Sequence, residues 1–295
     1  MLANSTIRLR YKWRVSRYGR IGVIVIAGLA LGAVLVAGRP IPQPETYHRF
    51  ADGRTLWGVP SALNVLSNLP FLAVGLLGFI FLARDSASAP RITDDAQGQL
   101  PKLEKPAYAV FFAGVLLTAF GSSYYHLAPS TERLFWDRLP MSVAFSALVA
   151  TVIAERISVK WSRILLLPFV IAGVASVIVW HLSEQRGSGD MRFYIFIQGF
   201  PMLALPMMML LFSSRYTNPK WLWLMILLYA AAKVTEVLDV QIWDAFGRVV
   251  SGHSLKHLLA AGATYSVLVM LGRRALRTES ASIPKGFSSF GRARS

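Results

Sequence analysis

Residues 107–126 read AYAVFFAGVLLTAFGSSYYH, a stretch without a single Lys, Arg, Asp or Glu. A helix needs about 20 predominantly apolar residues to cross the hydrocarbon core of a bilayer. Backbone groups in lipid must bond to one another, so such a run is helical. The stretch therefore predicts a membrane-spanning helix. Its polar end, with Ser122 and His126, is a candidate for function, because polar groups are costly at that depth.

Similar apolar runs recur along the 295-residue chain. The other seven are residues 21–38, 61–83, 139–154, 164–181, 193–212, 221–238 and 254–272, of which 139–154 is the shortest. One such run fits the buried helix of a soluble protein, but eight do not. Hydrophobic residues make up 54% of the chain and charged residues 16%, against about 45–50% and 25% in soluble proteins. The prediction is an all-α, polytopic membrane helix bundle.

The distribution of positive charge predicts the orientation of these helices. With the N-terminus placed inside, 21 of the 31 Lys and Arg residues fall in inner loops and tails and eight in outer loops. Because cytoplasmic loops carry the excess of Lys and Arg, both termini are expected in the cytosol. The basic residues flank the spans instead of forming one stripe, which argues against nucleic-acid binding despite the net charge of +16. We expect the basic tails to contact anionic lipid headgroups.

The N-terminal run 21–38 has two interpretations. No acidic residue precedes Glu45, and the first twenty residues are rich in Arg, as in signal and transit peptides. The run is longer than a usual signal core of about 7–15 residues, which favours an uncleaved anchor. The predicted organisation is a basic cytosolic tail (1–20), an extra N-terminal transmembrane helix (21–38), a seven-helix domain (52–272) and a basic disordered tail (273–295).

Ionisable groups gather at the predicted outer ends of the spans. They are His126, Asp137, Glu236, Asp239, His253 and His257. The i, i+4 spacing of His253 and His257 puts both rings on one helix face, as in helix-borne zinc pairs. His126 adds a third nitrogen at the same depth, and three histidines with an open fourth position describe a catalytic zinc site. The alternative is a set of interfacial histidines that bond backbone carbonyls.

The neighbouring polar residues fit the chemistry of such a site. A zinc-bound water has a pKa near 7 and becomes a nucleophile. Ser122 lies one turn before His126 and could stabilise an oxyanion, while Asp137 could transfer a proton or orient a histidine. The alternatives are a serine bonded to a carbonyl one turn earlier and a salt bridge from Asp137 to Arg133 or Arg138. The chain has no cysteine, which excludes disulfides and leaves histidine and water as zinc ligands.

Four short motifs occur in an order known from one family. They are NVLSN (64–68), GSSYYH (121–126), WDRLPM (136–141) and HSLKH (253–257). They resemble the Asn-x-x-Ser-Asn, Gly-Ser-x-x-Phe-His, Asp-Glu-x-Pro-Met and His-x-x-x-His motifs of the alkaline ceramidases. This family belongs to the CREST superfamily of seven-helix membrane zinc hydrolases, which includes the adiponectin-receptor-like proteins. The resemblance covers about residues 52–272 and leaves the first span as an addition.

The resemblance implies a seven-helix core around one catalytic Zn²⁺ held by His126, His253 and His257. It implies hydrolysis of the amide bond of a ceramide-like or other N-acyl membrane lipid by zinc-activated water, assisted by Ser122 and Asp137. Two alternatives stay open. One is an esterase or phospholipid-type hydrolase of the same superfamily, and the other is a non-catalytic, receptor-like protein that contains zinc.

The sequence departs from the family pattern at several positions. Arg138 replaces the acidic neighbour of Asp137, and Lys256 replaces the Trp before the last histidine. Eukaryotic members carry an acidic calcium-binding segment before the first core span, of which only Asp52 and Trp57 remain here. We therefore expect no calcium site, and we favour a bacterial inner membrane with the active site towards its outer face.

Three charged residues near the end of the run 221–238 lie outside these motifs. The spacing of Lys233, Glu236 and Asp239 is i, i+3, which places each beside the next on a helix. The prediction is a buried ion pair with at least one carboxylate that orients a zinc-bound histidine. The alternative is a salt bridge that only packs helices.

Overall fold

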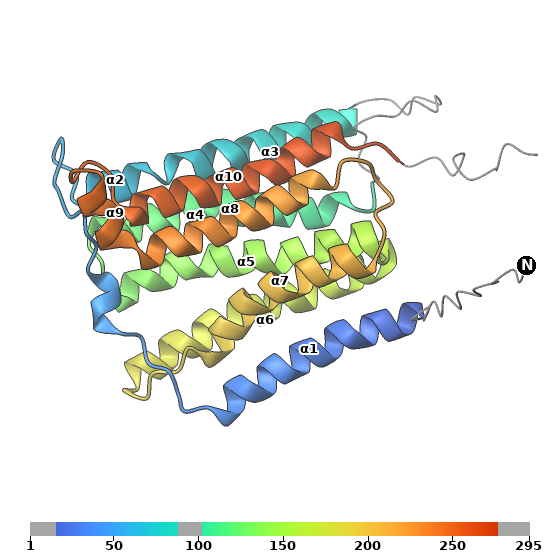
Figure 1. Ribbon diagram of the computed structural model, residues 1–295, viewed down its shortest axis with the longest axis horizontal. Coiled ribbons are helices and arrows are strands. Elements are labelled where there is room, and N and C mark those ends of the chain that lie inside the picture. Colours follow the sequence, from blue (N-terminus) through green and yellow to red (C-terminus); the bar gives the residue numbers. More distant parts are fainter. Residues whose placement is uncertain (1–15, 88–101, 277–295) are drawn as a thin grey trace, which may run out of the picture.

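The computed structural model describes residues 16–87 and 102–276. These residues form a helical bundle, in which the only β pairing consists of two isolated bridges, Leu56–Val59 and Tyr216–Leu276. The long helices run side by side (Figure 1). The predicted all-α, polytopic bundle is confirmed. The predicted basic tails fall largely on residues 1–15 and 277–295, which lie outside the described residues.

The helices follow the predicted apolar runs closely. They are α1 (Arg17–Ala37), α2 (Ala62–Leu66), α3 (Leu69–Ala87), α4 (Lys105–Leu127), α5 (Thr131–Arg156), α6 (Val159–Gln185), α7 (Arg192–Leu211), α8 (Lys220–Val237), α9 (Asp239–Ala245) and α10 (Gly252–Arg273), with a 3₁₀ turn η1 (Glu45–His48). Among the described residues, seven helical segments are long and apolar enough to cross a membrane. The eighth predicted run is α8, which continues into α9 after a bend of 83°.

Helix α5 is longer than its apolar run. It begins at Thr131, where the Ser130 side chain accepts a hydrogen bond from the backbone N–H of Arg133. Its first two turns contain Asp137 and Arg138, which are 6% and 5% exposed. Because protein and not lipid surrounds these charges, the helix tolerates them. The prediction that this span begins at Leu139 was therefore wrong by two turns.

The close packing of α4 and α5 depends on small residues. A Cβ atom on Gly114 would lie 2.7 Å from the backbone nitrogen of Ala144, and one on Gly121 would lie 2.0 Å from the carbonyl oxygen of Trp136. Small residues let helices approach in this way within membranes. Helix α5 is consequently the most buried of the candidate spans, at 72% of its apolar window, and α4 follows at 50%.

The N-terminal helix α1 lies at the edge of the bundle. Only 11% of its apolar window is buried, and it packs against α7 at the edge of the bundle (Figure 1). Gly28 of α1 lies against the ring of Phe200, where a Cβ atom would come within 2.8 Å. Helix α1 therefore packs on the outside of the bundle, and its being an addition to a seven-helix domain stays a prediction.

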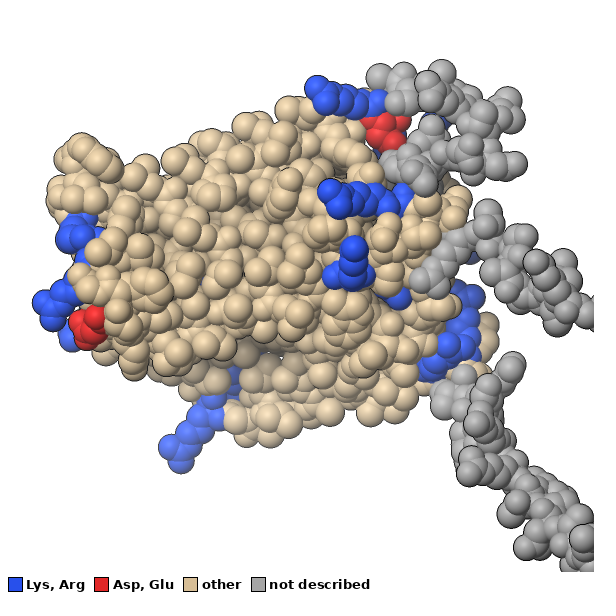
Figure 2. Space-filling view, turned by 45° about the horizontal axis from the view of Figure 1, so that its top comes forward, with Lys and Arg blue, Asp and Glu red and all other residues tan. Residues whose placement is uncertain are grey.

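The two ends of the bundle differ in character. Both described chain ends lie at one end, and α2, α9 and the loops beside them lie at the other (Figure 1). Lys and Arg side chains gather at the end where the described chain ends lie, with a smaller group opposite (Figure 2). The polar groups singled out in the sequence lie at the end that carries α2 and α9.

Candidate metal centre

Three buried histidines converge at the end of the bundle that carries α2 and α9. His126 lies in the last turn of α4, and His253 and His257 lie in the first turns of α10. Their side chains offer ring nitrogens that all lie within 4.8 Å of one another. The residues are 1%, 3% and 3% exposed, respectively. The predicted triad is thus brought together, and it could hold a metal ion.

The spacing of two ring nitrogens is that of two ligands of one metal ion. The Nε2 atoms of His126 and His253 are 3.2 Å apart. Two ligands of one tetrahedral zinc lie about 3.3–3.4 Å apart, given Zn–N bonds of about 2.0–2.1 Å. Two neutral imidazoles in this arrangement have nitrogens close enough to share either a proton or a metal ion. The Nδ1 atom of His126 has no hydrogen-bond partner among the described residues.

Ser67 contacts the ring of the third histidine. Its hydroxyl donates to the carbonyl oxygen of Asn64 at 3.1 Å, and it lies 2.8 Å from Nδ1 of His257. When its proton is directed to Asn64, the hydroxyl oxygen is free to accept from Nδ1–H of His257. The Nε2 atom of His257 then carries the lone pair, which is the tautomer that a metal requires. Ser67 belongs to the Asn-x-x-Ser-Asn motif, although its bond to His257 was not anticipated.

The first turn of α10 is held by α9. The carboxylate of Asp239 accepts from the backbone N–H of His253 at 2.7 Å and from that of Ala51 at 2.9 Å. A carboxylate at a helix N-terminus is also favoured by the helix dipole. Gly252 makes this approach possible, because a Cβ atom there would lie 2.3 Å from the carbonyl oxygen of Thr235. Asp239 therefore positions His253 by accepting from the backbone N–H of this histidine, and not by contacting the imidazole ring.

Phe50 covers the histidines from the loop that follows η1. The centroid of its ring is 4.7 Å from that of His126 and 4.3 Å from that of His253. Asp239 fixes this loop as well, through Ala51. On the same loop the carboxylate of Asp52 is bound by Arg54 at 2.8 Å. The expectation that no calcium binds here stays a prediction.

Ser122 and Asp137 meet beside the triad. The two residues are 2% and 6% exposed, and both line the same cavity. Gly121 allows α4 and α5 to approach closely here, because a Cβ atom there would lie 2.0 Å from the carbonyl oxygen of Trp136. Asp137 forms no salt bridge with Arg133 or Arg138 in the described part of the chain, so that alternative finds no support.

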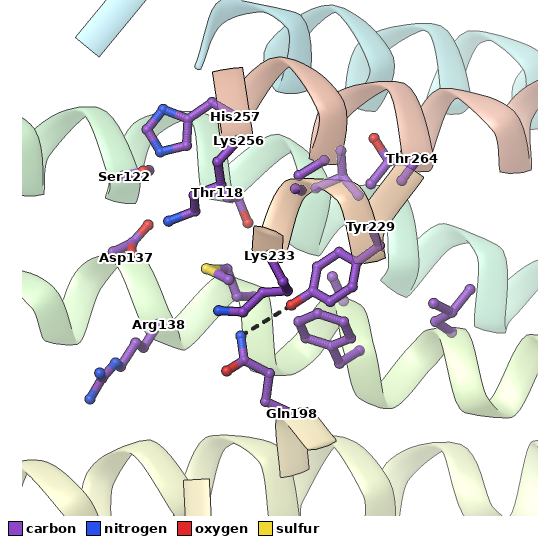
Figure 3. Close-up of a pocket in the computed structure, with 18 of the residues that line it drawn as sticks. Thr118, Ser122, Asp137, Arg138, Gln198, Tyr229, Lys233, Lys256, His257 and Thr264 are labelled. Atoms are coloured by element: carbon purple, nitrogen blue, oxygen red, sulfur yellow. Dashed lines mark hydrogen bonds between the residues drawn. The ribbon is translucent and has the colours of Figure 1, made fainter. Parts of the chain in front are cut away.

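A cavity of about 220 Å³ leads away from this group of side chains. Its polar end includes Ser122, Asp137 and His257 (Figure 3), and Glu236 also lines the cavity. The remainder is mainly apolar and is lined by side chains of α4, α5, α7, α8 and α10, among them Phe111, Val115, Leu148, Met202, Met225 and Ile226. The triad therefore lies at the polar end of a largely apolar cavity inside the bundle.

The predicted ion pair of Lys233 and Glu236 is present, but it is not fully buried, because the Lys233 side chain is 47% exposed. Glu236 also binds Lys256, whose Nζ lies 2.9 Å from Oε1. The expected neighbour Asp239 instead turns away, because the helix breaks at Leu238 before it reaches this residue. In the sequence, Lys256 stands out as a departure from the family pattern. Its position between two predicted ligands, in an apolar helix, is the signal that points to its role at the site.

No model of a known protein family matches the chain, and no curated protein matches it either. The resemblance to the alkaline ceramidases therefore stays a hypothesis. The structure does bring together the three histidines that the hypothesis names as metal ligands. The fold assignment rests on the seven described helices that are long and apolar enough to cross a membrane.

Proposed function

We propose that the protein is an integral-membrane, zinc-dependent hydrolase that cleaves the amide bond of an N-acyl lipid, in the manner of the alkaline ceramidases. The observation that carries the proposal is the position of the histidine triad. Three buried imidazoles meet beside the buried side chains of Ser122 and Asp137, at the polar end of an apolar cavity. Metal ligands, proton-transfer groups and space for a lipid chain are thereby adjacent.

The triad would hold zinc, which when bound supplies a Lewis acid and lowers the pKa of water. Asp137 would accept a proton from the attacking water and pass it to the leaving amine. Ser122 borders the cavity and would donate its hydrogen bond to the oxyanion that develops on the amide carbonyl. The C–N bond breaks, water adds across it, and the products are a fatty acid and an amine.

The cavity suits part of a lipid molecule. Its volume of about 220 Å³ is below the roughly 300–1,000 Å³ of ordinary ligand pockets. A long acyl chain would therefore extend beyond it. Helices α7 and α8 both line the cavity but touch each other at few points. We propose that the chain leaves between them towards the bilayer.

For the orientation, we propose cytosolic termini and a triad towards the outer face of a bacterial inner membrane. The predicted inner Lys and Arg excess supports this arrangement, and the triad lies at the end of the bundle opposite the described chain ends (Figure 1). A reporter fused after Arg274 should behave as cytosolic. A reporter that is accessible only from outside would reverse the orientation.

A lipid panel tests the proposed reaction. Purified protein in detergent should release fatty acid from acyl amides, and Asp137→Asn should lower the rate by about 10²–10⁴-fold. Ser122→Ala should cost about 10²–10³-fold, whereas Ser123→Ala, one position along and bonded to the carbonyl of Val65, should stay near wild type. Cleavage of acyl esters alone would favour an esterase, and zinc binding without turnover of any lipid would favour a receptor-like protein.

A further inference from the structure

The polar end of the cavity carries more positive than negative charge. The cations that line it are Arg138, Lys233 and Lys256, and the carboxylates are Asp137 and Glu236. A divalent metal ion bound by the histidines would increase the excess of positive charge. The Lys233 side chain is 47% exposed, so this charge becomes buried only when a ligand fills the cavity, and an anion on that ligand would then offset the excess positive charge.

The two lysines share one carboxylate. Lys256 and Lys233 bind different oxygens of Glu236, which can neutralise only one of them. Each ammonium group has three donors, so donors remain for a ligand. Figure 3 shows the charged ends of Lys256, Lys233 and Asp137 directed into the space between α5, α8 and α10.

The third cation has no carboxylate partner. Arg138 forms no salt bridge with any described residue, although it is 5% exposed. The centre of its guanidinium group lies 4.2 Å from the ring centroid of Trp180 and 4.6 Å from that of Tyr194, and Nη2 donates to Oε1 of Gln43 at 2.6 Å. Aromatic faces and one amide stabilise the charge only in part. Tyr194 also lines the cavity, so this cluster borders the space that a ligand would fill.

We infer that the lipid that enters this cavity carries an acidic group, a carboxylate or a phosphate, on the amine side of its amide bond. The inference rests on the proposed function and narrows its substrate class. The cations lie at the same end of the cavity as Ser122 and Asp137 (Figure 3), so the acid would sit a few bonds from the scissile carbonyl. The acyl chain would take the apolar part. Lys256 and Lys233 would donate charge-assisted hydrogen bonds to the anion.

Matched lipid pairs test this assignment. Binding is measured on the Ser122→Ala protein, whose cavity keeps every charge, so that slow turnover spares the ligand. N-palmitoylglycine is compared with N-palmitoylethanolamine, and ceramide 1-phosphate with ceramide. The acidic member of at least one pair should bind about tenfold more tightly or better, as one hydrogen bond to a charged group allows. The pair that shows the preference identifies carboxylate or phosphate. Equal binding within both pairs overturns the inference.

Three variants assign the preference to residues. Lys256→Gln leaves Glu236 neutralised by Lys233, so it should fold, and it should remove most of the preference. Arg138→Gln should reduce it, while Lys220→Gln, at the opposite end of α8, should leave it unchanged. A preference that survives Lys256→Gln, Lys233→Gln and Arg138→Gln alike overturns the assignment. Tighter binding of the acidic lipid without hydrolysis of any lipid would refute the proposed reaction and leave this inference standing. Equal hydrolysis of acidic and neutral lipids would refute this inference and leave the proposed reaction standing.

Discussion

Replacing Ser67 by Ala tests how the protein prepares His257 for a metal. The Ser67 hydroxyl lies 2.8 Å from Nδ1 of His257 and donates to the carbonyl of Asn64 at 3.1 Å. Without it, the buried Nδ1–H loses its acceptor, and the tautomer with a free Nε2 loses its preference. Residues that hold metal-bound histidines in this way are worth about 10–100-fold in metal affinity. That corresponds to about 1.4–2.7 kcal/mol at about 1.36 kcal/mol per factor of ten.

Chelator competition in detergent measures the zinc affinity directly. Ser67→Ala should raise the dissociation constant by about 10–100-fold and leave the helical content unchanged. The matched control is Ser266→Ala, a buried serine of α10 that bonds only the carbonyl of Gly262. An unchanged affinity in Ser67→Ala, or an equal loss in the control, would refute the role assigned to this hydroxyl.

Three further outcomes follow from the packing and the charges. Glu104 is fully buried and binds two arginines, so Glu104→Gln should lower the free energy of unfolding by about 3–5 kcal/mol. Asp244→Asn, at the exposed pair with Arg248, should change it by about 1 kcal/mol or less. Equal losses in the two variants would refute the burial argument. Gly121→Ala should lower the thermal stability by about 1–3 kcal/mol, because its Cβ would meet the neighbouring helix, while Gly199→Ala, with open space around it, should not. Burial lowers the pKa of His48 below 6.5, so in acid the unfolded chain binds more protons than the native state. The free energy of unfolding should therefore fall as the pH drops from about 6.5 towards the lowered pKa. A His48→Gln variant whose stability falls equally steeply with pH would contradict this cause.

The spans and the triad were predictable because each depends on local sequence. Apolar runs fix the helices, and the i, i+4 spacing fixes His253 and His257 on one face. The start of α5 was not predictable in the same way, since Asp137 and Arg138 look like the boundary of a span until neighbouring helices enclose them. The sequence alone does not show which charged residues the tertiary structure will bury.

The contacts that orient the triad depend on tertiary structure. Lys233 and Glu236 pair as their spacing predicts, but the break at Leu238 carries Asp239 onto another helix, where it holds the backbone of His253. Ser67 reaches His257 across 190 positions of sequence. Such partners are set by how α2, α9 and α10 meet, which no periodicity along the chain encodes.

The zinc content of the purified protein tests the central claim most directly. Elemental analysis of the wild-type protein should find about one zinc per chain, as three histidines with an open position hold one ion. His253→Ala should lose the metal, whereas His181→Ala, whose ring bonds Gln185 away from the triad, should retain it. Full zinc content in His253→Ala, or none in the wild-type protein after supply of the metal, would contradict the account.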